Sequence, residues 1–572
     1  MKLKPVVRRP SSNRTAGAVR SPANRPAVRP TPRPTILLSR PRPAGKSPRD
    51  DSKGVKVEMV RRALAVGLVC VLGFGPASMA AGQGVHRGGT LRVALSGDIV
   101  TLDPHLSGAA IDRQAYQNVF DKLVDTDENL TIVPMLATSW MVAADGRTVT
   151  FKLRQGVKFQ DGTPFNADAV KVNFDRMLDP KFPPIRKAEM RPVQRVTVID
   201  PYTVQVIMDK PYSPLLYALT DRAGMMLSPA ALAKDGMNFT QHPVGTGPFR
   251  FVERVVQDHV TFERTPDYWG KGLPYIDRLV FRVITSDPAR IANLKSGDVD
   301  IVANVPLPQE PELAREGAQP GASFHLLERG AFQWNAMPLN VTKPPFDNKL
   351  LRQALSLTID RRALAHVVLR DAAYPARSFF PNGTPAYDPS IPIPERNIAL
   401  AKEKLAQAGH PGGFTFTLLL AGSGQQDASI AQAIQSMAAE AGIHAQIQIL
   451  EGAAFLEMMQ KAQHQATLSI WSGRPDPDFD VYPFVTQTGI GGLNLADYVS
   501  DRATVLLDGA RLLSDMSQRR RAYSEVSRIV ADDVPYVFLF YPKEYKLVSS
   551  HVRGFVQVPD GMVRLRPVWL AP

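Results

Sequence analysis

The sequence predicts an α/β protein of mixed α+β units that is arranged in two lobes. Strand-like and helix-like patterns are interleaved along the chain, which indicates sheets packed against helices. Residues 82–572 number about 490, which is too many for one hydrophobic core. This part of the chain contains no long apolar segment, so we expect it to fold in water rather than in a membrane.

Strands are predicted where apolar and polar residues alternate. Residues 148–154 alternate in this way, which predicts a half-buried strand that ends before Gly156. The β-branched stretches 196–198 and 203–206 flank Asp-Pro-Tyr at 200–202, which predicts a turn between two strands.

Helices are predicted where apolar residues recur every three or four positions and a glycine follows. A helix that ends at a glycine and is followed by a strand occurs three times, over residues 290–301, 400–418 and 430–450, with Gly297, Gly409 and Gly442 as the helix ends. The sequence DGTP at 161–164 predicts a turn, and a further helix should follow from Ala167.

Residues 59–81 have the layout of a secretory signal peptide. A methionine and two arginines precede an apolar run over 63–74, a Gly-Pro pair breaks the run, and small residues stand at Ser78 and Ala80. The apolar run is shorter than the roughly 20 residues that span a bilayer. The sequence therefore predicts export to the periplasm, with cleavage near Ala80.

The segment 1–58 is rich in proline and arginine and lacks an apolar pattern, so we expect it to be disordered. It is either a basic tail for nucleic acid or an anionic membrane, or it is not translated because synthesis starts at Met59. Residues 1–80 hold 17 basic and three acidic side chains, so they carry the whole net charge of +14. The remaining chain is neutral overall and gives no reason to expect a nucleic-acid partner.

No motif for catalysis, metal binding or a cofactor is evident. Cys70 lies inside the predicted signal, so the exported chain would have no disulfide, thiol nucleophile or cysteine ligand. The ten histidines are scattered without zinc-type spacing. The glycines at 245–247 lack a phosphate-loop ending and predict a turn between strands, and the acidic stretch that begins at Asp476 lacks the glycine and glutamate of a calcium loop.

Several segments, taken together and in order, resemble the family 5 periplasmic solute-binding proteins of ABC transporters. The most specific is GVKFQDGTPF at 156–165, and the others are residues 88–105, 136–176, 243–251, 266–284, 294–302, 344–361, 401–409 and 471–478. The resemblance implies a type II fold with two lobes and an extra subdomain in lobe one. It further implies a binding protein rather than an enzyme, monomeric and without a cofactor, that delivers its ligand to a membrane permease.

By this resemblance, lobe one comprises residues 86–327 and 541–572, and lobe two comprises residues 328–540. The ligand would lie between the lobes. A small peptide or peptide-like solute that carries a carboxylate is the first hypothesis. A nickel chelate, haem, glutathione or a sugar-like ligand remains an alternative, as do a periplasmic sensor of the same fold and an exported hydrolase.

The segment WSGRPDPD at 471–478 is the strongest candidate for ligand binding. It follows an apolar strand, and loops at strand ends commonly bind ligands in α/β proteins. In dipeptide-binding relatives the corresponding loop supplies a carboxylate for the ligand's ammonium group, whereas here Arg474 follows the glycine. Arg474 would either clamp a ligand carboxylate or neutralise Asp476 as an internal pair. We therefore predict Trp471, Arg474 and Asp476 as ligand contacts.

Two further segments face the cleft according to the resemblance. Residues 102–105, which include His105, follow the first strand, and residues 332–335 enter lobe two. His105, Trp334 and Asn335 are accordingly predicted ligand contacts, and loop capping or hinge packing are the alternative roles for these segments.

Overall fold

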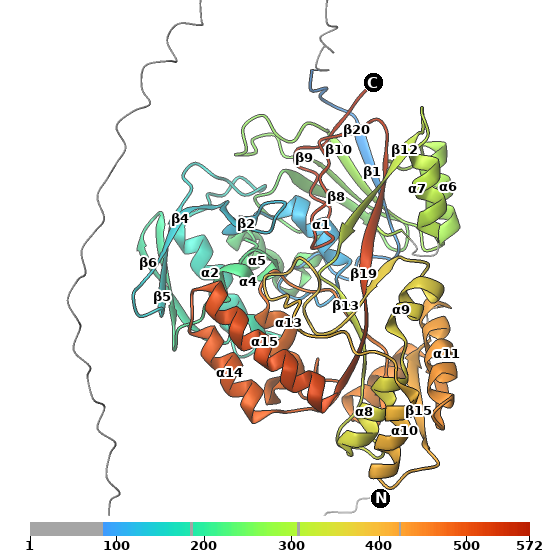
Figure 1. The fold of residues 1–572 in the computed structure, drawn as a ribbon. Helices are drawn as coiled ribbons and strands as arrows, with labels where there is room; N and C mark the ends of the chain where they lie inside the picture. The colour runs from blue at the N-terminus through green and yellow to red at the C-terminus, as the bar shows by residue number, and fades with distance from the viewer. Residues whose placement is uncertain (1–83, 184–186, 306–308, 423–424) are drawn as a thin grey trace, which may run out of the picture. The chain divides into compact units, whose positions relative to one another are not determined.

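A computed structural model describes residues 84–183, 187–305, 309–422 and 425–572. The predicted extension 1–58, the signal 59–81 and Cys70 lie outside these residues. The described part contains one ten-stranded sheet, one four-stranded sheet, one three-stranded sheet and two strand pairs, with helices between them (Figure 1). The predicted mixed α/β class is confirmed. None of the described helices combines the length and the apolarity that crossing a membrane would need.

The large sheet has the order β18-β13-β19-β11-β1-β10-β9-β8, and β12 and β14 also pair with β19. β1 pairs in parallel with β10 and β11, whereas the other pairs are antiparallel. The strands are β1 (Thr90–Leu95), β8 (Phe249–Val255), β9 (His259–Arg264), β10 (Arg278–Val283), β11 (Ile301–Val302), β12 (Phe324–Gly330), β13 (Trp334–Pro338), β14 (Ala373–Pro375), β18 (Ser469–Trp471) and β19 (Tyr536–Ser549).

β19 is the long strand that joins the two predicted lobes. Its first half pairs with β13 and β14, and its second half, from Lys543 to Ser549, pairs with β12 and β11. Figure 1 shows it in red, running between β13 at one end and β12 at the other. The predicted lobe boundaries at 327/328 and 540/541 therefore fall inside the strands β12 and β19, which both belong to this one sheet.

The hydrophobic cores are segregated along the chain. Two cores consist only of residues between 334 and 541, and two others only of residues between 91 and 303 or between 548 and 568. A smaller core around Ala94, Ala372 and Leu547 joins both groups beside β19. The division into two lobes remains a prediction, and this separation of the cores supports it.

The extra subdomain is built on the four-stranded antiparallel sheet β4-β5-β7-β6. Its core includes Phe151 of β5 and Phe174 of α2. Asn166 caps α2 by accepting a hydrogen bond from the Ala169 amide at 3.0 Å, as its place before the predicted helix favours. The elements are β4 (Ala137–Val142), β5 (Thr148–Leu153), α2 (Ala167–Leu178), α3 (Lys187–Met190), β6 (Val193–Asp200) and β7 (Thr203–Met208), and the pair β2 (Val124–Thr126) and β3 (Ile132–Pro134) precedes them.

The chain between 339 and 467 contributes the three-stranded parallel sheet β16-β15-β17 and the helices that pack on it. Phe416 and Leu418 of β15 pack with Leu351 and Leu355 of α8 and with Ile434 of α11. The elements are α8 (Lys349–Thr358), α9 (Arg361–Ala363), the π-helical η5 (Leu364–Val368), α10 (Ile398–Gln407), β15 (Phe414–Ala421), α11 (Gln425–Ala439), β16 (Ile443–Leu450), α12 (Gly452–Gln460) and β17 (Ala466–Thr467).

Three helices, α13 (Asp478–Val485), α14 (Asp501–Arg511) and α15 (Met516–Asp533), cover an aromatic core around Trp334. Trp334 of β13 is fully buried, and its ring meets Phe379, Phe484, Tyr536 and Phe538 edge-on at 4.9 to 6.2 Å between centroids. Such perpendicular contacts suit the charge distribution of aromatic rings. The core fixes β13 and β19 against the helices that follow the candidate loop.

Helix α1 (Asp112–Val119) is polar in sequence, yet all eight of its residues are buried. Two of its amides explain how this is possible. Gln114 donates to the Gly561 carbonyl and accepts from the Val563 amide, and Asn118 does the same with Val563 and Leu565. The two side chains thus pair with the C-terminal backbone as a neighbouring strand would, which satisfies groups that would otherwise be unpaired.

The remaining elements connect these layers. They are α4 (Leu215–Ala218), η2 (Arg222–Gly224), α5 (Pro229–Asp235), η3 (Gly236–Gln241), α6 (Asp287–Ser296), α7 (Glu310–Gly317), η6 (Gln487–Gly489), β20 (Val552–Arg553) and β21 (Trp569–Leu570). The predicted β6–β7 turn and the three helix–glycine–strand units are confirmed. The loop 243–248 was predicted to join two strands, which is wrong, because it follows η3.

We expect the stability of the fold to depend on the protonation of Glu310, the first residue of α7. This side chain is buried, and its Oε2 has no hydrogen-bond partner among the described residues. Desolvation raises its pKa from the ordinary 4.5 to about 7, although Lys543 and Arg370 act in the opposite direction. Because the folded pKa is raised, the stabilisation is present below pH 4.5 and is lost as the pH rises through 7.

Between pH 4.5 and 7.5 the wild type should lose about 2 kcal/mol of unfolding free energy relative to Glu310→Gln. Denaturant unfolding of both proteins across this pH range measures the difference. Glu312→Gln, in the same turn but exposed, is the control. A constant difference between wild type and Glu310→Gln would contradict the prediction.

Candidate ligand-binding site

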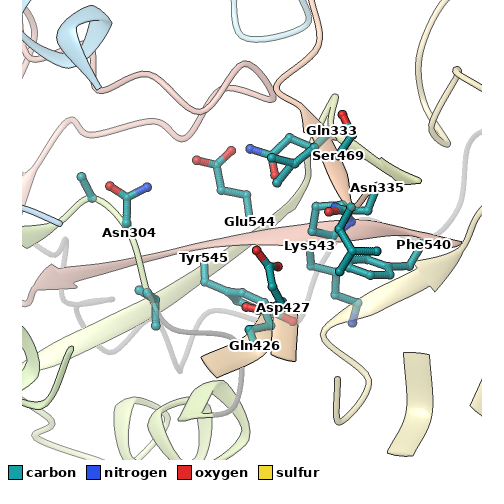
Figure 2. Close-up of a pocket in the computed structure, with 15 residues that line it drawn as sticks. Asn304, Gln333, Asn335, Gln426, Asp427, Ser469, Phe540, Lys543, Glu544 and Tyr545 are labelled. Atoms are coloured by element: carbon teal, nitrogen blue, oxygen red, sulfur yellow. The ribbon is translucent and has the colours of Figure 1, made fainter. Parts of the chain in front are cut away.

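A pocket of about 240 Å³ lies where β11, β13, β18, β19 and the start of α11 meet. Figure 2 shows the amides, carboxylates and aromatic rings that surround it. Its polar lining comes from β13, β18, β19, the start of α11 and two loops, and it includes Asn304, Gln333, Asn335, Gln426, Asp427, Ser469, Lys543, Glu544 and Tyr545. Because these residues come from both predicted lobes, the pocket would change its size if the lobes moved.

The pocket combines uncharged amides with two carboxylates, of which one has a cationic partner and the other has none within the described residues. The Nδ2 atom of Asn335 is sealed from solvent and has no hydrogen-bond partner among the described residues. Glu544 accepts a hydrogen bond from Lys546 at 3.0 Å, so its charge is compensated. Asp427 stays exposed and makes no ion pair within the described part of the chain, and partial desolvation raises its pKa. Asp427 is therefore the carboxylate that a cationic group could engage.

β18 leads from this pocket into residues 471–480, which comprise a loop and the first turn of α13 and are called the loop 471–480 below. Ser469 and Ile470 line the pocket, and Trp471 pairs with Trp334 across the β18–β13 ladder. The loop then bends at Gly473, whose φ of +61° favours glycine. A Cβ atom at this position would lie 1.8 Å from the carbonyl oxygen of Phe332, so only glycine allows the two segments to approach.

Trp471 is half-buried and begins the loop. Its Nε1 donates to Asp480 at 2.9 Å, and its ring packs edge-on against Phe484. The guanidinium of Arg474 lies over the same ring, 5.0 Å from its centroid. Burial raises the pKa of Asp480 well above its usual range. The indole is thus held rigidly beneath Arg474, in a geometry that favours the cation.

Arg474 reaches from this loop to the opposite segment of the chain. Its Nε lies 3.6 Å from Oδ2 of Asp221, and its Nη1 donates to the Gly473 carbonyl at 2.7 Å. The backbone amide of Arg474 donates to Asp480 at 2.8 Å. Arg474 is therefore the loop's charged side chain that faces predicted lobe one.

Asp476 is fully buried, and Arg519 of α15 holds both of its oxygens, at 2.8 and 2.5 Å. The next carboxylate, Asp478, is held in the same two-pronged way by Arg511 of α14, at 2.8 Å for each bond. The sequence left open an internal pair between Asp476 and Arg474, and the structure gives Asp476 a partner in Arg519. As a ligand contact Asp476 remains a prediction, and contact would require this pair to open.

His105, Trp334 and Asn335 lie in three different environments. His105 is fully buried, accepts a hydrogen bond from Arg176 at 3.2 Å and faces the Met225 carbonyl at 3.3 Å. Trp334 is the centre of the aromatic core, whereas Asn335 lines the pocket. All three remain predictions as ligand contacts, and the first two are covered by other side chains.

Four residues that sequence reasoning did not single out belong to this region: Arg113, Asp221, Asp427 and Glu544. Arg113 of α1 donates to Asp221 at 3.2 Å and is buried. No sequence motif marks these residues. The composition of α1 is that of a helix exposed to solvent. Arg113 therefore stands out only once the fold shows that this helix is buried. Within the described residues, no group of His, Cys, Asp and Glu side chains is arranged to hold a metal ion.

The model of the bacterial extracellular solute-binding proteins, family 5, matches residues 131–492, which is more than half of the chain. The chain belongs to this family. It is 31% identical over 476 residues to the glutathione-binding protein GsiB of Escherichia coli O1:K1, and the match covers 82% of this chain and 92% of that protein. Membership identifies the chain as the extracytoplasmic solute-binding subunit of an ABC importer, and the family is one of binding proteins rather than enzymes.

Two solved structures of family members are similar to this one. The periplasmic binding protein DppA of Helicobacter pylori, in complex with the peptide STSA, has a TM-score of 0.76 and 27% identity, covering 85% of this chain and 99% of its own. AgaA of A. tumefaciens R10, in complex with agropinic acid, has a TM-score of 0.75 and 26% identity, covering 85% of this chain and 99% of its own. The predicted type II periplasmic binding fold is thereby confirmed.

Proposed function

We propose that this family member captures a small peptide-like solute that carries a carboxylate, and that glutathione is the first candidate. The observation that carries the proposal is the charge of the loop 471–480. Its three carboxylates, Asp476, Asp478 and Asp480, have partners inside the same part of the fold, whereas Arg474 pairs with Asp221 of the opposite segment, where a solute carboxylate could take the place of Asp221. The loop thus offers a cation to a solute, and a guanidinium binds a carboxylate well.

The opposite end of the solute would lie in the pocket, with an ammonium group near Asp427 and amide groups near Gln333 and Asn335. Ser469 lines the pocket and Arg474 lies five residues further along the chain. Five extended residues span at most about 17 Å. A tripeptide is about 10 Å long when extended, so it would reach both places if they lie closer together than this upper limit.

The ligands named for two relatives support the same class of solute. GsiB is named for glutathione, a peptide with two carboxylates, and AgaA is in complex with agropinic acid, which is also an acid. For this chain we propose binding without turnover, in a monomer that is exported by the segment 59–81 and cleaved near Ala80. Closure of the lobes around the solute would create the form that the permease recognises.

Replacing Arg474 by alanine should weaken the binding of glutathione by about 1.5–3 kcal/mol, or roughly 10- to 150-fold in Kd, because a charge-assisted contact is lost. Titration calorimetry of the wild type and the variant measures the effect. Arg502→Ala is the control, because Arg502 is exposed on α14 and outside the pocket. Equal affinity of Arg474→Ala and the wild type would refute the role of Arg474.

The ligand class is tested by native mass spectrometry of protein purified from its own periplasm. A released solute with the mass of glutathione or of a short peptide would support the proposal. A released metal chelate or sugar would refute the ligand class and leave the family assignment intact. Titration with glutathione, with N-acetylated glutathione and with a neutral dipeptide amide then separates the contribution of the ammonium from that of the carboxylates.

A further inference from the structure

Three arginines surround the carboxylate of Asp221. Arg113 donates to its Oδ1 at 3.2 Å, and the Nε atoms of Arg474 and Arg222 lie 3.6 and 3.8 Å from its Oδ2. The side chain of Asp221 is only 8% exposed, so these charges interact with little screening by water. Nη1 of the buried Arg113 has no hydrogen-bond partner among the described residues. The cluster is therefore close but not fully hydrogen-bonded.

The backbone holds Asp221 firmly in this place. It lies in a tight turn between α4 and η2, and a Cβ atom at Gly224 would come within 1.8 Å of the Leu219 carbonyl oxygen, so the turn needs glycine there. Ser213, which precedes α4, contacts the end of α14, because its amide donates to the Arg511 carbonyl at 2.9 Å. Asp221 is consequently positioned opposite Arg474 by the fold and not by the ion pair alone.

The contact between Asp221 and Arg474 is weaker than the contact that a solute could make. A separation of 3.6 Å is longer than a hydrogen bond, whereas a two-pronged pair between arginine and carboxylate has bonds of about 2.7–2.9 Å. The Asp476–Arg519 pair in the same region shows such geometry. Asp221 and a solute carboxylate are the same chemical group and would approach the same guanidinium.

We propose that Asp221 sets the affinity and the anion selectivity of the site as an internal competitor for Arg474. The inference rests on the proposed function, because it takes Arg474 as the contact for a solute carboxylate. The free energy that a solute gains at Arg474 is only the difference between two pairing energies. One is that of the solute with Arg474, and the other is that of Asp221 with Arg474, which is lost. An anion that binds Arg474 only weakly therefore does not displace Asp221. A carboxylate that is also positioned by Trp471 and the pocket displaces it.

The test is titration calorimetry with glutathione on the wild type, Asp221→Asn, Arg474→Gln and the double variant. We expect Asp221→Asn to bind glutathione about 3- to 10-fold more tightly, since a competing carboxylate is removed. The gain should vanish in the Arg474→Gln background. Asp388→Asn is the control, because Asp388 pairs with Arg528 at the surface of α15. Tighter binding by the control as well would overturn the inference.

Weaker binding by Asp221→Asn, or an equal gain with and without Arg474, would overturn the inference and leave the proposed function standing. An equal Kd for glutathione in the wild type and in Arg474→Gln would overturn the proposed contact. If no variant binds glutathione, the same four proteins are unfolded by denaturant. A coupling of at least about 3-fold in the unfolding constant between positions 221 and 474 would support the pairing and refute glutathione as the solute. The absence of coupling would overturn the inference.

Should Asp221→Asn fail to fold by circular dichroism, the variant Asp221→Asn/Arg222→Gln replaces it. This pair of changes removes one negative and one positive charge together, so the buried cluster keeps its charge balance. Arg222 donates to the carbonyls of Ser107 and Ala109 and is not a proposed ligand contact. The Arg222→Gln protein is then the reference in every titration, with the same expected gain and the same contrary results.

Discussion

Replacing Arg519 by leucine is expected to lower the free energy of unfolding by about 3–5 kcal/mol, because Asp476 would stay buried without its partner. Asp476 is fully buried, and Arg519 is nearly so, with 3% of its side chain exposed. The two hydrogen bonds between them join the loop 471–480 to α15. Guanidinium chloride unfolding at neutral pH, followed by far-ultraviolet circular dichroism, measures the loss.

Arg528→Leu on the same helix is the matched control. Arg528 is half-exposed and pairs with Asp388, so its loss should cost less than about 1 kcal/mol. The double variant Asp476→Leu/Arg519→Leu should recover part of the stability, since no unpaired charge is left behind. A loss in Arg519→Leu no larger than in Arg528→Leu would contradict the structural role assigned to Asp476.

Trp334→Ala should lower the free energy of unfolding by about 3–5 kcal/mol, which is the usual effect of truncating a buried aromatic side chain. Trp334 is fully buried, and four aromatic rings contact it, so the cavity left behind could not close without moving β13, β19 and α13. The same denaturant measurement checks it. Glutathione affinity should also fall, because Phe484 contacts both Trp334 and Trp471.

Trp334→Phe separates the contribution of ring packing to the unfolding free energy from that of the polar indole N–H. The Nε1 of Trp334 has no hydrogen-bond partner among the described residues, so phenylalanine removes an unsatisfied donor and keeps most of the apolar contact. We expect a loss of about 1–2 kcal/mol for this variant. Tyr374→Ala, at an exposed aromatic on β14, should change the stability by less than about 1 kcal/mol. Equal losses for the phenylalanine and alanine variants would contradict the packing argument.

Local patterns predicted many of the elements correctly. The strand at 148–153, the turn between β6 and β7 and the helix ends at Gly297, Gly409 and Gly442 all depend on neighbouring residues along the chain. The loop at 243–248 was assigned between strands, because its glycines and proline mark a break in structure without identifying the element before it. The element before it is η3, at Gly236–Gln241. Its sequence GMNFTQ has no apolar period long enough to predict a helix.

The candidate site could be predicted only in part. The loop 471–478 stood out, because a tryptophan, an arginine and acidic residues follow a strand. Its internal pairing could not be derived, because the partner of Asp476 lies 43 residues away on α15. The same holds for Asp221 and Arg113, which are 108 residues apart and share no motif. His105 and Trp334 were chosen from their positions in motif segments, and their burial became visible only in the folded chain.

The sequence alone determined the family, the mixed α/β class, several strands and helices of the described chain and the position of Arg474 directly after Gly473. These properties depend on residue order, on short-range periodicity and on similarity to relatives. The tertiary structure decided which charges pair and which aromatic rings are buried. The physical reason is that an ion pair is selected by distance and burial, and residues far apart in the sequence acquire both only when the chain folds.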